Sequence, residues 1–158
     1  TNHDKVDFFL DTVSTAKSKK VKDIIGYFHT IKPNRIEAEI LTGIEINNDD
    51  DLKRASEYLL KKGVKNVFIS LGQNGVFYND GYKMNHMKIP KIKAVNATGA
   101  GDAFMAGLAY GYYYGMDIEE TAKFAIAASI IAISHEDTIN PYISVENIKL
   151  KMKEMELC

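Results

Sequence analysis

The order of strand-like and helix-like segments is the feature that most constrains the fold of this chain. Short runs of apolar and β-branched residues alternate with longer segments in which apolar residues recur at helical spacing. In chain order we predict a strand at 7–13, a helix at 14–28, a strand ending at Pro33, helices at 34–43 and 47–63, a strand at 65–72, a hairpin over 75–90, and helices at 102–115, 117–134 and 143–157. This alternation predicts an α/β layered fold with a mainly parallel sheet and one antiparallel hairpin.

Length, charge and cysteine content narrow the class of protein. The 158 residues are enough for one domain, and we predict a single domain over 1–158. The 20 basic and 21 acidic residues nearly cancel and form no long basic run, which argues against nucleic acid or an anionic membrane as partner. The one cysteine, Cys158, cannot form an internal disulfide or a cysteine-based zinc site. With no apolar run of about 18 residues and no signal-like start, we expect a cytoplasmic location.

A glycine turn followed by an acid is the strongest chemical signal. Residues 95–107 read VNATGAGDAFMAG, and the glycines lie where a helix begins. Unpaired N–H groups and the helix dipole favour an anion at such a place, and glycine lets the anion approach the backbone. Asp102 at its edge could accept a proton from a hydroxyl that attacks a phosphoryl group. The alternative is that Asp102 only caps the helix.

Two other nucleotide-binding glycine motifs do not match this segment. The dinucleotide fingerprint needs a third glycine where the chain has Phe104, and no G-K-[ST] triplet follows any of these glycines. The pattern therefore argues against a dinucleotide-binding dehydrogenase and against a Walker-type NTPase.

Three ordered motifs resemble one family. NATGAGDAFMAG resembles the C-terminal signature of the ribokinase-like carbohydrate and nucleoside kinases, the phosphofructokinase-B-type family. KPNRIEAEILTG (32–43) resembles that family's N-x-x-E segment, and ISLGQNGVF (69–77) resembles its nucleotide-loop strand. The resemblance implies a three-layer α/β/α fold, of which this chain would be the C-terminal, nucleotide-binding half.

The resemblance also implies roles for the glycine turn. Asp102 would be the general base toward the acceptor hydroxyl. Gly99, Ala100 and Gly101 would form an anion hole for the transferred phosphoryl group. ATP and Mg²⁺ would be the cofactors.

Further roles are implied around the nucleotide. Asn34 and Glu37 would lie near magnesium and the triphosphate, with Glu37 acting on the metal through water. Ser70, Gly72 and Gly75 would lie along the ribose and phosphates. The alternatives are a solvated helix face for Glu37 and a plain strand-to-hairpin turn for the three residues of the nucleotide loop.

A monovalent-cation site is a third implication. Many family members hold such a cation, K⁺ for instance, beside the anion hole, largely through backbone carbonyls. The matching segments are Asn96–Thr98, with Asn96 and Thr98 as candidate ligands, and 132–137 with Asn140. Asn96 stands where an aspartate is common, and the loss of that charge leaves K⁺ dependence open. His29, His86 and His135 show no metal-ligand spacing and are interpreted as structural or surface residues; Tyr112–Tyr114 are interpreted as helix packing.

Two segments bear on the acceptor. FLDTVSTAK (9–17) and SHEDTINP (134–141) resemble bacterial pseudouridine kinases, which implies phosphorylation of a nucleoside C-glycoside at its 5′-hydroxyl. Ribose, fructose or a fructose phosphate stays open as acceptor. A non-catalytic nucleotide-binding fragment and an unrelated α/β domain also stay open as interpretations of the chain.

Nothing in the chain resembles the family's N-terminal acceptor-binding part and lid. Lids position the substrate and exclude water. We therefore expect weak or no turnover by these residues alone, and self-association, for example as a homodimer, through apolar edges that the missing part would cover.

Overall fold

The computed structural model describes residues 6–89, 94–137 and 140–155. The chain divides into two compact units, 1–88 and 89–158, which are described in turn. That the two units make one domain stays a prediction.

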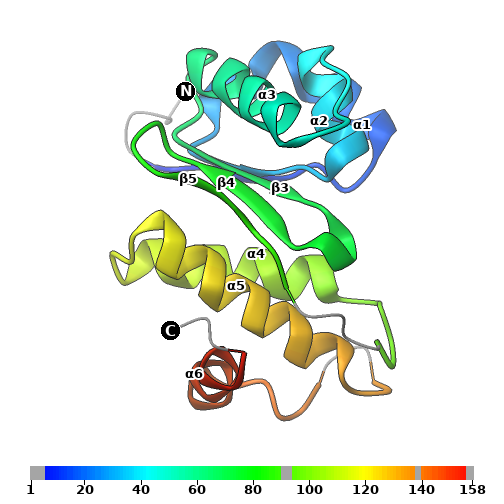
Figure 1. The fold of residues 1–158 in the computed structure, drawn as a ribbon, viewed down its shortest axis with the longest axis vertical. Coiled ribbons are helices and arrows are strands. Elements are labelled where there is room, and N and C mark those ends of the chain that lie inside the picture. Colours follow the sequence, from blue (N-terminus) through cyan, green and yellow to red (C-terminus); the bar gives the residue numbers. More distant parts are fainter. Residues whose placement is uncertain (1–5, 90–93, 138–139, 156–158) are drawn as a thin grey trace. The chain divides into compact units, whose positions relative to one another are not determined.

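The first unit is built on a five-stranded sheet (Figure 1). Its strands are β1 (Phe9–Asp11), β2 (Thr30–Lys32), β3 (Asn66–Ser70), β4 (Val76–Asn79) and β5 (Met84–Met87), in the spatial order β1-β2-β3-β4-β5. The pairs β1/β2 and β2/β3 are parallel, whereas β3/β4 and β4/β5 are antiparallel. The predicted α/β fold, with parallel strands and an antiparallel hairpin in one sheet, is confirmed. The sheet is less parallel than predicted, because β3 and β4 also pair antiparallel.

Three helices cover one face of this sheet (Figure 1). They are α1 (Thr15–Val21), α2 (Arg35–Thr42) and α3 (Asp49–Lys61), and two short 3₁₀ helices, η2 (Lys22–Tyr27) and η3 (Gly72–Asn74), complete the unit. The core that these helices form with the sheet holds fully buried residues from strands and helices alike, among them Ile31, Val67, Ile69, Leu41 and Leu59.

Local sequence signals set most of the helix ends. The Asn48 side chain accepts a hydrogen bond from the Asp51 N–H and begins α3, and Gly43 in the left-handed conformation (φ 77°) ends α2. The single helix predicted over 14–28 is wrong in its second half, which is the 3₁₀ segment η2. There the backbone of Gly26 lies so close to the Lys62 carbonyl that a Cβ would overlap its oxygen.

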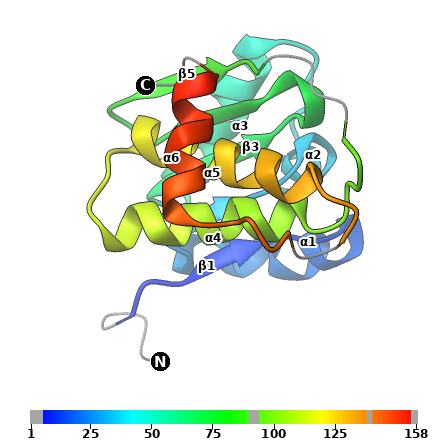
Figure 2. The ribbon, with the colours of Figure 1, turned by 90° about the horizontal axis from the view of Figure 1, so that it is seen from below.

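The second unit is helical. Its helices are α4 (Ala100–Tyr113), α5 (Ile118–Ile133) and α6 (Val145–Glu154), and α6 crosses α5 (Figure 2). Helices α4 and α5 run antiparallel with close backbones, because Gly107 faces Ala125 and Gly111 faces Thr121. No helix among the described residues is long and apolar enough to cross a membrane.

The interpretation of Tyr112–Tyr114 as helix-packing residues holds only in part, because all three side chains are largely exposed although the Tyr113 and Tyr114 rings contact each other. Their exposed fractions are 45%, 80% and 62%. The Tyr110 ring stacks on Phe124 of α5 at 4.5 Å between centroids, and the Tyr114 ring packs on Tyr110 at 4.4 Å.

Candidate active site

The carboxyl ends of the three parallel strands bring together two predicted residues, Asn34 and Ser70, with Thr12, which was not predicted. Thr12 follows β1, Asn34 follows β2 after Pro33, and Ser70 ends β3. The Ser70 N–H donates to the Pro33 carbonyl at 2.9 Å, and Asn34 and Ser70 pair in a parallel bridge. In open α/β sheets, this edge is where ligands bind.

Asn34 and Glu37 form a reciprocal cap at the start of α2. The Glu37 N–H donates to Asn34 Oδ1 at 2.9 Å, and the Asn34 N–H donates to Glu37 Oε2, also at 2.9 Å. The N-x-x-E spacing is thus a capping box, which satisfies two N–H groups that the helix leaves unpaired.

Glu37 is buried rather than solvated, so the helix-face alternative is wrong. Only 3% of Glu37 is exposed, and the Thr12 hydroxyl donates to the same Oε2 at 2.5 Å. Oε1 accepts no hydrogen bond from the residues that the structure describes. A carboxylate oriented by two donors, with a second oxygen available, suits a water of magnesium hydration.

An ion pair between a buried lysine and a half-buried aspartate links β2 to β1 and was not predicted. Lys32 Nζ lies 3.1 Å from Asp11 Oδ2, and these two residues are register partners on β2 and β1. Because Ile31 faces the core beneath the helices, Lys32 and Asp11 lie on the opposite face of the sheet. Asp11 Oδ1 also accepts from the Val13 N–H, and Val13 holds a positive φ of 58°.

The other predicted nucleotide residues form a tight turn between β3 and β4. Gly72 (φ 59°) and Gly75 (φ 92°) both have backbone conformations that side chains disfavour, and a Cβ at Gly75 would overlap the Met87 carbonyl oxygen. The Leu71 N–H donates to the Gly75 carbonyl at 2.9 Å. This geometry is compatible with a nucleotide-binding loop and with a plain strand-to-hairpin turn. The role of the turn in nucleotide binding stays a prediction.

In the second unit, the glycine turn opens α4. Gly99 is the N-cap in the left-handed conformation (φ 85°), without a side-chain cap. Ala100 and Gly101 are the first two helical residues, and Asp102 is the third. Asp102 is exposed and accepts no hydrogen bond from the described residues, so it is not an N-cap. The arrangement presents uncapped N–H groups next to a carboxylate.

Asn96 lies against the end of α5, and Thr98 is hydrogen-bonded to Asn96. The Asn96 amide contacts the Glu136 carbonyl and the Thr98 N–H, and Asn140 contacts the Ile131 carbonyl. The loop that leads into the glycine turn is therefore hydrogen-bonded to the segment that was predicted to share a cation with it, 132–137 with Asn140.

The histidines have structural partners. His86 Nδ1 lies 2.8 Å from Asp49 Oδ1, and its Nε2 lies 3.0 Å from the Asn74 carbonyl oxygen. His29 contacts the Thr30 hydroxyl, and His135 contacts Asp137. Within residues 6–89, 94–137 and 140–155, no three His, Cys, Asp or Glu side chains gather to hold a metal ion.

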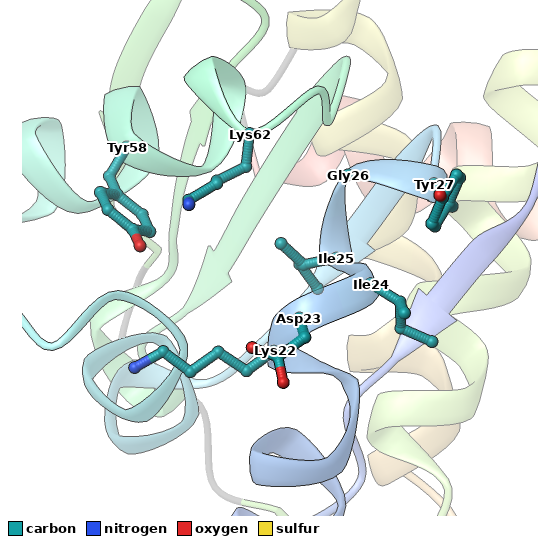
Figure 3. Close-up of a pocket in the computed structure, with 8 residues that line it drawn as sticks. All are labelled: Lys22, Asp23, Ile24, Ile25, Gly26, Tyr27, Tyr58 and Lys62. Carbon is teal, nitrogen blue, oxygen red and sulfur yellow. The ribbon is translucent and has the colours of Figure 1, made fainter.

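A pocket of about 380 Å³ lies elsewhere in the first unit. It is formed by η2 together with Tyr58 of α3 and Lys62, the residue that follows this helix (Figure 3). These segments precede β2 and β3, so the pocket lies toward the amino ends of the strands, and no predicted site residue lines it. The Lys62 ammonium lies 5.3 Å from the centre of the Tyr58 ring, as expected for a cation–π pair.

The fold is that of the ribokinase-like proteins. Residues 1–144 match the pfkB family of carbohydrate kinases, and the chain belongs to this family. A curated relative, the pseudouridine kinase of Escherichia coli strain K12, is 39% identical over 148 residues, which make up 93% of this chain and 47% of the relative.

Solved structures agree. A candidate sugar kinase from Clostridium perfringens is 50% identical with a TM-score of 0.93, over 96% of this chain and 48% of that one. An Arabidopsis thaliana ribokinase, solved with ribose and ATP, is 26% identical with a TM-score of 0.78, over 94% of this chain and 48% of that one. The chain spans about half the length of the relatives it matches.

Proposed function

We propose that this chain is part of an ATP-dependent phosphotransferase that acts on a hydroxyl of a sugar or nucleoside. The observation that carries the proposal is the start of α4, where a left-handed glycine N-cap leaves N–H groups open beside the Asp102 carboxylate. Membership of the pfkB family supports it.

In this proposal, the start of α4 performs the chemistry. The Asp102 carboxylate accepts the proton of the acceptor hydroxyl as that oxygen attacks the γ-phosphorus of ATP. The bond from phosphorus to the bridging oxygen breaks, and ADP leaves. The N–H groups of Gly99, Ala100 and Gly101 stabilise the charge on the phosphoryl oxygens, a contribution of a few kcal/mol in comparable sites.

The ends of the parallel strands hold the nucleotide in this proposal. Bound magnesium would neutralise part of the triphosphate charge, and Glu37 would orient one of its waters. Asn34 and Thr12 fix the Glu37 carboxylate. Ser70, Gly72 and Gly75 would follow the ribose and phosphates.

For the acceptor we propose pseudouridine, converted to pseudouridine 5′-phosphate. The 39% identity to the Escherichia coli pseudouridine kinase supports this choice. Ribokinase and 1-phosphofructokinase relatives, at 31–36% identity over shorter stretches, keep different sugars and sugar phosphates open as acceptors. The alternative is a binding function rather than an enzymatic one: a fragment that binds nucleotide without turnover. For residues 1–158 taken alone, we further propose weak turnover and self-association.

The test is ADP release from magnesium-ATP over a panel of acceptors. Pseudouridine, uridine, ribose and fructose 6-phosphate are compared for residues 1–158 and for the whole gene product. Release with pseudouridine above all others supports the proposed acceptor, and release with another member reassigns it. ATP binding without acceptor-dependent ADP in the whole gene product would contradict the kinase proposal.

A further inference from the structure

The Asn96 side chain joins the loop before the glycine turn to the end of α5. Asn96 Nδ2 lies 2.9 Å from the Glu136 carbonyl oxygen, and the Thr98 N–H donates to Asn96 Oδ1 at 2.9 Å. A carbonyl only accepts and a backbone N–H only donates, so the two partners fix which end of the amide is oxygen and which is nitrogen.

The carbonyl groups at the end of α5 already have donors. The Ile133 carbonyl accepts from the N–H groups of Val95 (2.9 Å) and Asn96 (3.3 Å). The Ile131 carbonyl accepts from the buried Asn140 amide at 2.6 Å and from the Ser134 hydroxyl at 2.7 Å. These oxygens lie at the negative end of the helix dipole, and neutral N–H and O–H groups occupy them.

A monovalent cation does not fit this arrangement. The family resemblance implies a cation held by such carbonyls together with an aspartate at position 96. In this chain, the Nδ2 group of Asn96 supplies the positive end of a dipole to Glu136. A carboxylate at position 96 would place an oxygen against that carbonyl oxygen. Two acceptors repel each other unless a cation lies between them.

We propose that the Asn96 amide takes the place of a monovalent cation in fastening the glycine turn, so that this protein needs no K⁺. The inference rests on the proposed function for its catalytic consequence, because the fastened loop leads into Gly99–Gly101. Its structural consequence is independent of turnover: an aspartate at position 96 should make the protein depend on K⁺ for stability.

The experiment compares the wild type and Asn96→Asp in the full chain. Thermal unfolding is followed in KCl and in tetramethylammonium chloride at equal ionic strength, because the organic cation is too large for a carbonyl site. ADP release by the whole gene product is measured in the same two salts. Asn85→Asp is the matched control, since Asn85 is exposed on β5 and gains the same charge.

We expect the wild type and Asn85→Asp to have the same melting temperature and turnover in both salts. Asn96→Asp should melt several degrees lower in tetramethylammonium than in KCl. Its turnover should be roughly tenfold lower without K⁺, the effect of one misplaced contact.

Three results would overturn the inference. They are a saturable rise of wild-type melting temperature or turnover with K⁺, an Asn96→Asp variant that is indifferent to K⁺, and an Asn96→Asp variant that folds in neither salt. The proposed function fails separately: if no ADP forms with any acceptor but the melting temperatures follow the expected pattern, the inference about Asn96 stands and the kinase proposal does not.

Discussion

The Thr12 hydroxyl donates a hydrogen bond to Glu37 Oε2 at 2.5 Å across 25 positions of sequence. It joins the end of β1 to the first turn of α2, and both side chains are buried, with exposed fractions of 1% and 3%. Glu37 is therefore oriented from two directions, by its own helix cap and by a neighbouring strand.

Replacing the Thr12 hydroxyl tests this orientation. In Thr12→Val, a methyl group takes the place of the donor and Glu37 keeps only the Asn34 N–H. We expect the free energy of unfolding to fall by about 1–2 kcal/mol, because a buried acceptor loses a partner. We also expect the Mg²⁺ concentration needed for half-maximal ADP release to rise. Urea unfolding and a magnesium titration of the whole gene product measure the two effects.

Thr12→Ser is the control for this change. It keeps the hydroxyl and should retain the magnesium requirement of the wild type. Equal magnesium requirements in Thr12→Val and Thr12→Ser would show that the hydroxyl does not position Glu37.

The proposed base is tested by Asp102→Asn. The amide has the size of the carboxylate but cannot accept the proton in the same way, so turnover should fall about 10²–10⁴-fold. The affinity for ATP should stay the same, because the N–H groups of the turn are unaltered. Initial rates and equilibrium binding of ATP separate the two quantities.

Glu120→Gln provides the comparison, since Glu120 is an exposed acid in the first turn of α5. It should leave turnover unchanged. If Asp102→Asn kept wild-type turnover, the proton acceptor would have to be another group.

The close approach of α4 and α5 predicts a penalty for one added methyl group. An ideal Cβ at Gly107 would lie 2.6 Å from the Ala125 Cα. Gly107→Ala should lower the free energy of unfolding by about 1–3 kcal/mol through overpacking, although alanine is the better helix former. Ala109→Ser on the exposed side of α4 should change it far less. If urea unfolding showed Gly107→Ala to be more stable than the wild type, α4 and α5 would have to move apart to fit the methyl group without a loss of stability.

The first turn of α3 predicts a pH dependence of stability. The Asn47 N–H, and then the Arg54 guanidinium, hold the pKa of the Asp51 carboxyl below its ordinary value of 3.8. A carboxyl with a lowered pKa in the folded state stabilises the protein above the unfolded value, and this stabilisation is lost as the pH falls through the folded value. Asp51→Asn should therefore be less stable than wild type at neutral pH, with a difference that shrinks below about pH 3.8.

Midpoints of urea unfolding across this pH range measure the difference. Asp50→Asn in the same turn is the control, because Asp50 is exposed. A difference between Asp51→Asn and wild type that is independent of pH would contradict the assignment.

The fold was predictable where the signals are local. Periodicity and caps predicted the elements and their order, and the Asn79-Asp80-Gly81 turn predicted the hairpin that joins β4 and β5. The change to a 3₁₀ helix at 22–27 was not predictable, because its cause is the approach of Gly26 to Lys62. The exposure of Tyr112–Tyr114 likewise depends on which face of α4 meets α5.

In the candidate site, too, local contacts were predictable from the sequence and tertiary contacts were not. The contact between Asn34 and Glu37 could be predicted from the sequence, because a capping box joins residues three positions apart. Thr12 and the Lys32–Asp11 ion pair were missed, because tertiary contacts bring their partners together: strand register pairs Asp11 with Lys32, and the packing of α2 brings Glu37 to Thr12. An aspartate that ends a strand and the threonine directly after it were the available signal, but nothing in the sequence pairs them with a lysine and a glutamate more than twenty residues later.

The capping box at the start of α2 has a consequence for how this segment changes in evolution. The same atoms of Asn34 and Glu37 begin a helix and orient a carboxylate, so selection for folding preserves them whether or not the chemistry is used. A descendant that had lost catalysis would still retain asparagine and glutamate, or glutamine, at these positions. Their presence in a related sequence is therefore weak evidence of activity, whereas an intact Asp102, the proposed base, which supports no cap, is the more informative residue to compare.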